Sequence, residues 1–253
     1  MKLTRRELLV GAGGFAAGLT VAGLGNLVPT ALAADVTWPY PYKKLDPEAV
    51  RKAGYDAYFE GGCCYGAFKA IIGELQKQVG APYTSLPLDM MRFGEGGSAG
   101  WGTLCGALNG SSAAITLVAG KEYSKLVNEL NGWYCGAQFP SKAHEAYCKV
   151  KDQVANACGS PLCHVSVSEW CKVSGKKVGS AERKDRCAKL TGDVAAKAVE
   201  MLNALADAKL ALGWKPTEDY ATCMGCHNGP NSMLDNEQGK MDCVPCHGDP
   251  HKK

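Results

Sequence analysis

The sequence predicts an all-α fold, with a cysteine-rich helical domain followed by a short, mostly irregular C-terminal segment. Two observations lead to this prediction. Apolar residues recur at steps of three and four through most of the chain, and no stretch of any length alternates polar and apolar residues as a strand does. The last helical pattern fades near residue 212. We therefore expect a leader over 1–34, a helical domain over 35–212 and a C-terminal segment over 213–253.

The first two helices are defined by their end signals. Asp46 suits the cap of a helix and Pro47 its first turn, so a helix should run from there to about Phe59. The pair Gly61-Gly62 should end it. A second helix is expected over 64–79, where apolar residues form one stripe.

Four further helical stretches are expected in the rest of the domain. The first, 101–119, is dense in Gly, Ala and Ser, and such small residues let backbones approach closely. Helices are also expected over 121–133, 141–154 and 181–212, the last being the longest. A loop over 158–164 interrupts the helical pattern.

The C-terminal segment carries two Cys-x-x-Cys-His pentads, Cys223-Met224-Gly225-Cys226-His227 and Cys243-Val244-Pro245-Cys246-His247. Each has the chemistry of a c-type haem attachment site, in which two thiols bond to the haem vinyl groups and the adjacent histidine ligates the iron. A zinc ribbon could use the same four cysteines, but it does not need a histidine after each pair. The pentads therefore predict a di-haem c-type cytochrome.

The N-terminus reads as a twin-arginine export signal. Arg5-Arg6 precedes a mildly apolar stretch rich in Gly and Ala, which ends in the cleavage pattern Ala31-Leu32-Ala33. No later segment approaches a membrane span, so we expect a periplasmic protein without stable membrane insertion; an uncleaved anchor is the alternative. Because this route carries folded proteins, it suggests a second cofactor that is loaded before export, such as an iron–sulfur cluster.

The charge balance excludes several partners. The chain has 28 Lys and Arg against 25 Asp and Glu, a net charge of +3. Loss of residues 1–34 would remove three basic side chains and one acidic one, which leaves a net charge near +1. This is too little for nucleic acid or a strongly charged membrane surface.

Of the thirteen cysteines, the pentads use four, so nine are left in the body. An odd number cannot all form disulfides within one chain. Four stand out by context, and these are Cys64, Cys105, Cys163 and Cys187. The other five are expected to be structural or to lie near the same site, and these are Cys63, Cys135, Cys148, Cys158 and Cys171.

These cysteines resemble a family of redox proteins named for its C…GCAxxG…C…C pattern. Gly62-Cys63-Cys64, the run 105–110, the run 159–163 and Cys187 follow the family's order and approximate spacing. Leu104 departs from the pattern, because it stands where the pattern's name gives Gly. The first cysteine is doubled, so Cys63 competes with Cys64.

With the export signal and the pentads added, the whole mature chain resembles the split-Soret cytochromes c of sulfate-reducing bacteria. That resemblance implies a homodimer, two closely packed haems per subunit and a helical body with a [2Fe–2S]-type cluster. Thiolates are the ligands of such clusters, so Cys64, Cys105, Cys163 and Cys187 are the predicted set. Zinc or disulfides at the same thiols remain alternatives.

Five histidines are available to ligate iron. His227 and His247 are proximal by their motifs, and we rank His144 and His164 above His251 as distal ligands. Methionine is an alternative distal ligand.

Two bis-histidine haems would leave no open site, which predicts outer-sphere electron transfer with redox protein partners rather than enzymatic catalysis. The alternative is an oxidoreductase that reduces a small oxyanion or a metal at an open haem or cluster. A redox-sensing module is a third possibility.

Overall fold

The computed structural model describes residues 37–230, 232 and 239–248. The predicted leader and His251 lie outside the described residues. Helices dominate, and the described residues contain no strand, only isolated antiparallel bridges between Leu104 and Leu162 and between Phe139 and Asn156. The all-α prediction is confirmed. None of the helices in the described residues is long and apolar enough to cross a membrane.

The first helix, α2 (Pro47–Gln78), has a break at the predicted place. The Asp46 side chain accepts a hydrogen bond from the Glu48 amide at 2.9 Å and caps the N-terminus. At Gly62, φ is +80°, and an added Cβ would lie 2.8 Å from the Glu95 side chain. Glycine is therefore required here, and the break sets the direction in which the cysteine-bearing half of α2 continues.

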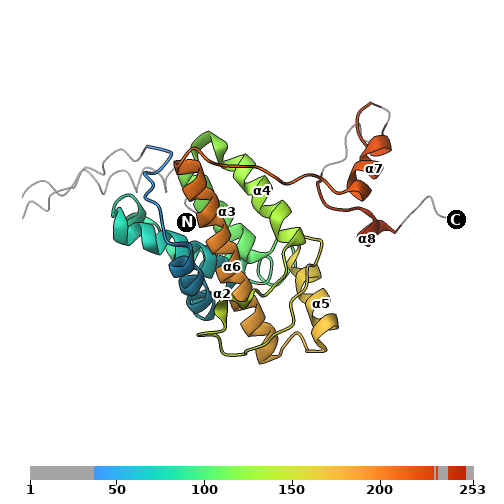
Figure 1. The fold of residues 1–253 in the computed structure, drawn as a ribbon, viewed down its shortest axis with the longest axis horizontal. Coiled ribbons are helices and arrows are strands. Elements are labelled where there is room, and N and C mark those ends of the chain that lie inside the picture. Colours follow the sequence, from blue (N-terminus) through green and yellow to red (C-terminus); the bar gives the residue numbers. More distant parts are fainter. Residues whose placement is uncertain (1–36, 231, 233–238, 249–253) are drawn as a thin grey trace, which may run out of the picture. The chain divides into compact units, whose positions relative to one another are not determined.

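Three helices form the centre of the body: α2, α3 (Gly106–Val118) and α6 (Ala181–Ala206) (Figure 1). The small residues permit close contact, as predicted. A Cβ on Gly110 would lie 2.2 Å from the carbonyl oxygen of Cys64. A Cβ on Gly54 would lie 3.0 Å from the Cα of Gly192, so α2 also meets α6 almost backbone to backbone. α4 (Tyr123–Gly136) packs against α3 and α6.

The helix expected over 101–119 begins only at Gly106. Gly97, Gly100 and Gly102 all have positive φ, so the chain before it turns repeatedly instead of coiling. The backbone of this turning segment pairs with the start of α5 (Cys163–Ser174). The Cys163 amide donates to the carbonyl of Thr103 at 2.7 Å. Cys163 thus opens a helix that the sequence did not suggest.

The helix predicted over 141–154 is wrong. Only the short 3-10 turn η4 (Lys142–His144) forms there. Side chains of α6 take up the backbone groups that a helix would need: Asp185 accepts from the amides of Lys149 and Val150 at 3.3 Å, and the Lys189 amine donates to the Val150 carbonyl at 2.6 Å. These tertiary bonds outweigh the local periodicity.

The remaining elements are short. α6 ends at Ala206, six residues before the predicted end, because Ala208 has a φ of +55°. The 3-10 turns are η1 (Tyr83–Ser85), η2 (Leu88–Gly94) and η3 (Gly120–Glu122). The C-terminal segment holds α7 (Glu218–His227) and α8 (Val244–His247), joined to the body by extended chain.

Candidate functional site

Both pentads lie at the ends of short helices. The first pentad forms the C-terminal end of α7. In the second pentad, Cys243 is the N-cap and the other four residues form α8. In a helix, residues three and four apart share a face, so the two thiols and the histidine of each pentad point the same way. Neither helix has a buried residue, and His227 and His247 are exposed. The pentads thus present the groups that covalent haem attachment needs on helices that have no buried residue.

The C-terminal segment is anchored on α4 at its start. The Glu129 carboxylate accepts hydrogen bonds from the amides of Gly213 at 3.0 Å and Trp214 at 2.9 Å. The indole of Trp214 occupies the space above Gly132, where an added Cβ would lie 1.9 Å from its Cδ1 atom. α4 therefore has a notch at Gly132 that receives the tryptophan.

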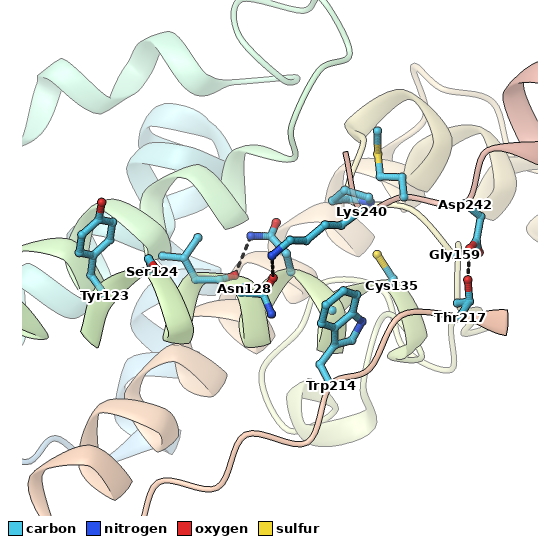
Figure 2. A pocket seen from close by; sticks show the side chains of 14 residues that line it. Tyr123, Ser124, Asn128, Cys135, Gly159, Trp214, Thr217, Lys240 and Asp242 are labelled. Carbon is cyan, nitrogen blue, oxygen red and sulfur yellow. Dashed lines mark hydrogen bonds between the residues drawn. The ribbon is translucent and has the colours of Figure 1, made fainter. Parts of the chain in front are cut away.

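A second contact is made just before α8. The Lys240 amine donates to the Asn128 side chain at 2.5 Å and lies 5.9 Å from the centre of the Trp214 ring. The Thr217 hydroxyl donates to the Asp242 carboxylate, which ties the entries of α7 and α8 together. Between the segment and α4 lies a cavity of about 470 Å³, on which Cys135 also borders (Figure 2).

The histidines predicted as distal ligands occupy different surroundings. His164 lies in the first turn of α5 and is exposed, and its amide donates to the Gly102 carbonyl at 3.1 Å. His144 is fully buried. Its Nε2 atom lies 2.9 Å from Asp193 Oδ1, and its Nδ1 atom lies 3.0 Å from the Tyr147 hydroxyl. Both ring nitrogens of His144 already have partners.

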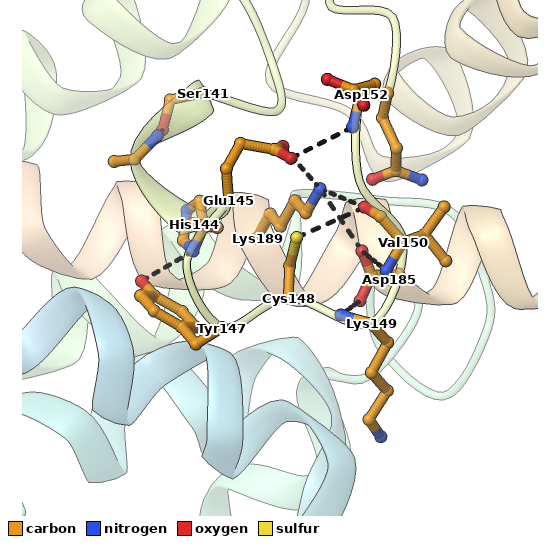
Figure 3. A network of polar contacts seen from close by, with 12 residues as sticks. Ser141, His144, Glu145, Tyr147, Cys148, Lys149, Val150, Asp152, Asp185 and Lys189 are labelled. Carbon is orange, nitrogen blue, oxygen red and sulfur yellow. Dashed lines mark hydrogen bonds and ion pairs between the residues drawn. The ribbon is translucent and has the colours of Figure 1, made fainter.

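His144 belongs to a buried polar network between α6 and the loop that follows α4 (Figure 3). Asp193 also accepts from the amide of Ser141 at 3.0 Å and from its hydroxyl at 2.6 Å, and it pairs with Arg51. Burial would raise the pKa of Asp193, but the hydrogen bonds from His144 and Ser141 outweigh it, and the pKa is below its usual value. The arrangement holds the loop on α6.

A second group of polar residues holds the same loop further along. Lys189 is fully buried and lies 3.4 Å from a Glu145 oxygen and 3.5 Å from an Asp185 oxygen. The hydroxyl of Tyr55 donates to Asp185 at 2.6 Å. The buried charges of this network are therefore compensated, as buried charges must be.

The body brings four thiols together around the N-terminal ends of α3 and α5. They belong to Cys63, Cys105, Cys163 and Cys187, and the charges of neighbours in this set raise the pKa of Cys63, Cys105 and Cys163. Burial is the main cause that raises the pKa of Cys63 and Cys105, followed by the neighbouring thiols for Cys63. For Cys163, burial and then Cys105 raise the pKa to about 12. Such thiols are poor free nucleophiles and suit a ligand role in which a metal displaces the proton.

The doubled cysteines of α2 differ in direction. A Cβ added at Gly106 would lie 2.3 Å from Cys63 Sγ, so that thiol faces the start of α3 beside Cys105. Cys64 instead points to η2, because a Cβ on Gly94 would lie 2.6 Å from its Sγ atom. Burial, then Cys105, raises the pKa of Cys64 to about 12, and neither Cys163 nor Cys187 is among the causes. Cys63 therefore groups with the other three thiols more closely than Cys64 does.

Within the described residues, no three His, Cys, Asp or Glu side chains converge closely enough to hold a single metal ion. A two-iron centre is wider than one ion and needs its thiols further apart. The set fits such a centre in its chemistry. It consists of thiols alone, of which two are buried and two partly buried, and two members stand at helix N-termini, where backbone amides favour an anion.

Comparison with known proteins identifies the family. A family model described as "Putative redox-active protein (C_GCAxxG_C_C)" matches residues 65–201. The chain is 36% identical to the split-Soret cytochrome c of Desulfovibrio desulfuricans (strain ATCC 27774 / DSM 6949 / MB) over 98% of this chain and 95% of that protein. The chain belongs to the split-Soret cytochrome c family. The predicted resemblance is thus confirmed.

A solved structure of the same family supports the fold. It is described as "A novel iron centre in the split-Soret cytochrome c from Desulfovibrio desulfuricans ATCC 27774", and it matches with a TM-score of 0.76 and 37% identity over 82% of this chain and 90% of that chain. Together the matches establish a redox electron-transfer protein with the helical fold of split-Soret cytochromes c. The match of the family model begins at Tyr65, directly after the doubled cysteines, and includes the other three thiols.

Two features of the chain were not predicted from its sequence. Cys63 was considered only as a competitor of Cys64, and the Gly61-Gly62 break that directs the two thiols was the signal that could have raised its rank. Arg186, a buried cation beside Cys187 on α6, was not considered at all. Its exposure of 1% could not be read from the sequence, since arginine is rarely buried without a partner.

Proposed function

We propose that this protein is a periplasmic electron carrier with two covalently attached haems c and a thiolate-held iron centre. The observation that carries the proposal is the pair of exposed pentads on α7 and α8. Cys223 and Cys226 would hold one haem and Cys243 and Cys246 the other. His227 and His247 would be the proximal ligands. When bound, the haems supply one-electron chemistry, while the chain positions and ligates them.

For the distal ligands we propose His164 and His251. His164 is exposed, and its side chain has no hydrogen bond within the part of the chain that the structure describes, so it can turn toward a haem of its own or of a second subunit. His144 could serve only by leaving Asp193 and Tyr147, which would leave a buried carboxylate short of a donor. His251 is therefore preferred to the earlier choice of His144. Two such haems have no open position, which supports outer-sphere transfer to redox protein partners.

For the iron centre we propose Cys63, Cys105, Cys163 and Cys187, with Cys63 in place of Cys64. The effect of the other three thiols on the pKa of Cys63 and the contact of Cys63 with the start of α3 support this set. A [2Fe–2S]-type cluster fits the donor chemistry. Export by the twin-arginine route, with the centre already inserted, and a homodimer complete the proposal; both rest on the sequence and on the family.

The experiment combines iron analysis, EPR and carbon monoxide binding on the purified protein. We expect more than two iron atoms per chain, a cluster signal in one redox state, and a reduced spectrum that carbon monoxide does not change. A shifted spectrum would show an open haem and favour an oxidoreductase. Two iron atoms per chain without a cluster signal would reduce the protein to a plain di-haem cytochrome.

A further inference from the structure

Arg186 is a fully buried guanidinium that has no carboxylate partner among the described residues. It lies on α6 next to Cys187 and is 1% exposed. Its Nη2 atom donates to the Ser166 hydroxyl at 3.0 Å, while its Nε atom has no acceptor. A buried charge without an opposite charge is costly, and arginine cannot lose its proton to avoid the cost.

Lys189, three residues further along the same helix, shows what a compensated cation looks like here. It is equally buried, yet Asp185 and Glu145 lie within 3.5 Å of its amine and the Val150 carbonyl accepts a hydrogen bond at 2.6 Å. The fold is thus able to supply carboxylates to a buried cation of α6. It does not do so for Arg186.

The groups that do face Arg186 are the thiols of the candidate iron centre. Arg186 is the neighbour of Cys187 on α6, and its Nη2 atom donates to Ser166, which lies one turn after Cys163 on α5. Arg183 adds a second cation on the same side, with its Nη1 atom 3.9 Å from Cys187 Sγ, but it is only partly buried. The anion that Arg186 lacks is therefore to be found among these thiols when they bind iron as thiolates.

We propose that Arg186 is the fixed counter-cation of the thiolate-held iron centre and sets that centre's reduction potential. The inference rests on the centre under the proposed function. A cluster held by thiolates is an anion, and reduction by one electron makes it more negative. A fixed positive charge beside two of its thiolates stabilises the reduced form more than the oxidised form, which raises the potential. The same charge also favours the metal-bound thiolates over the four free, neutral thiols.

The test compares Arg186→Gln, Arg186→Lys and Arg183→Gln with the wild type. For each, iron content is measured and the potential of the centre is found by EPR-monitored titration, with the haem potentials as an internal reference. In Arg186→Gln, we expect at least a tenfold shift toward the oxidised form, about 59 mV for one electron, or loss of the centre. Arg186→Lys keeps the charge and should stay within about threefold of the wild type. Arg183→Gln, at a partly exposed site, should shift less than Arg186→Gln.

An unchanged potential in Arg186→Gln, with the centre retained, would overturn the proposal. So would equal losses in the Gln and Lys variants, because shape rather than charge would then be the requirement. If Arg186→Gln does not fold, Arg186→Lys decides: retention near the wild-type potential supports the proposal and loss overturns it. Absence of a cluster signal in the wild type would instead overturn the iron centre itself, so the two failures are distinguishable.

Discussion

Gly132→Ala should release the C-terminal segment from the body. The notch above Gly132 holds the Trp214 indole, and an added methyl group would lie 1.9 Å from the ring. Rotation of the methyl group cannot relieve this overlap, because the α4 backbone fixes the position of the added Cβ. The ring must therefore move, and the Glu129 bonds to Gly213 and Trp214 should weaken with it.

The magnitude follows from what the segment would lose. Partial exposure of a half-buried tryptophan costs about 1–2 kcal/mol at about 25 cal/mol per Å². Two hydrogen bonds to a carboxylate contribute about 1.5–3 kcal/mol each, though solvent at this exposed site reduces them to roughly 1 kcal/mol together. Against this, alanine stabilises α4 by about 1 kcal/mol over glycine. Only the losses act on the docking of the segment, so the free energy of local opening should fall by about 2 kcal/mol. This raises the population of the open segment by a factor of roughly 30.

Hydrogen exchange at the amides of Gly213 and Trp214 measures this opening directly, since both donate to Glu129. The matched control is Gly136→Ala on the same helix, where an added Cβ meets nothing within 4 Å. We expect about 30-fold faster exchange in Gly132→Ala and wild-type exchange in Gly136→Ala. Equal exchange in all three proteins would refute the account of the notch.

Three further predictions concern the body. Cys63→Ser should lower the non-haem iron content more than Cys64→Ser; the reverse order would restore Cys64 as the ligand. Asp193→Asn should make the free energy of unfolding depend less on pH in acid. The pKa of Asp193 is lowered in the folded protein, so its contribution to stability is present above the unfolded pKa near 3.8 and is lost as pH falls through the lower folded value. Urea unfolding from pH 5 to pH 2.5 tests this, and equal slopes would count against it. Gly110→Ala should destabilise the body by about 1–3 kcal/mol in thermal unfolding, because its Cβ would overlap the Cys64 carbonyl. Gly73→Ala, with open space around the added Cβ, should not. Equal melting temperatures of the two variants would contradict the packing of α3 on α2.

The helix ends that are encoded locally could be predicted from the sequence. Asp46 caps α2, and Gly61-Gly62 breaks it, because a cap and a positive φ depend only on neighbouring residues. The close contact at Gly110 also followed from residue size. The all-α class and the family were confirmed for the same reason, since motif and periodicity are local properties.

The failures have a common cause in long-range contacts. The segment 141–154 has helical periodicity, but the carboxylates that unwind it, Asp185 and Asp193, lie on α6 and are visible only in the folded chain. Whether Cys63 or Cys64 faces Cys105 depends on how the chain turns at the break in α2. The uncompensated charge of Arg186 likewise depends on which side chains surround it after folding.

The central claim is that the C-terminal segment covalently carries two haems that lie close together. Intact-mass spectrometry of the denatured protein, with an absorption spectrum of the native protein, tests it most directly. We predict that the mature chain is heavier by two haems, that Cys226→Ala weakens one attachment and leaves the other, and that the Soret band of the native protein is split. A mass without haem, or an unsplit Soret band, would contradict the claim.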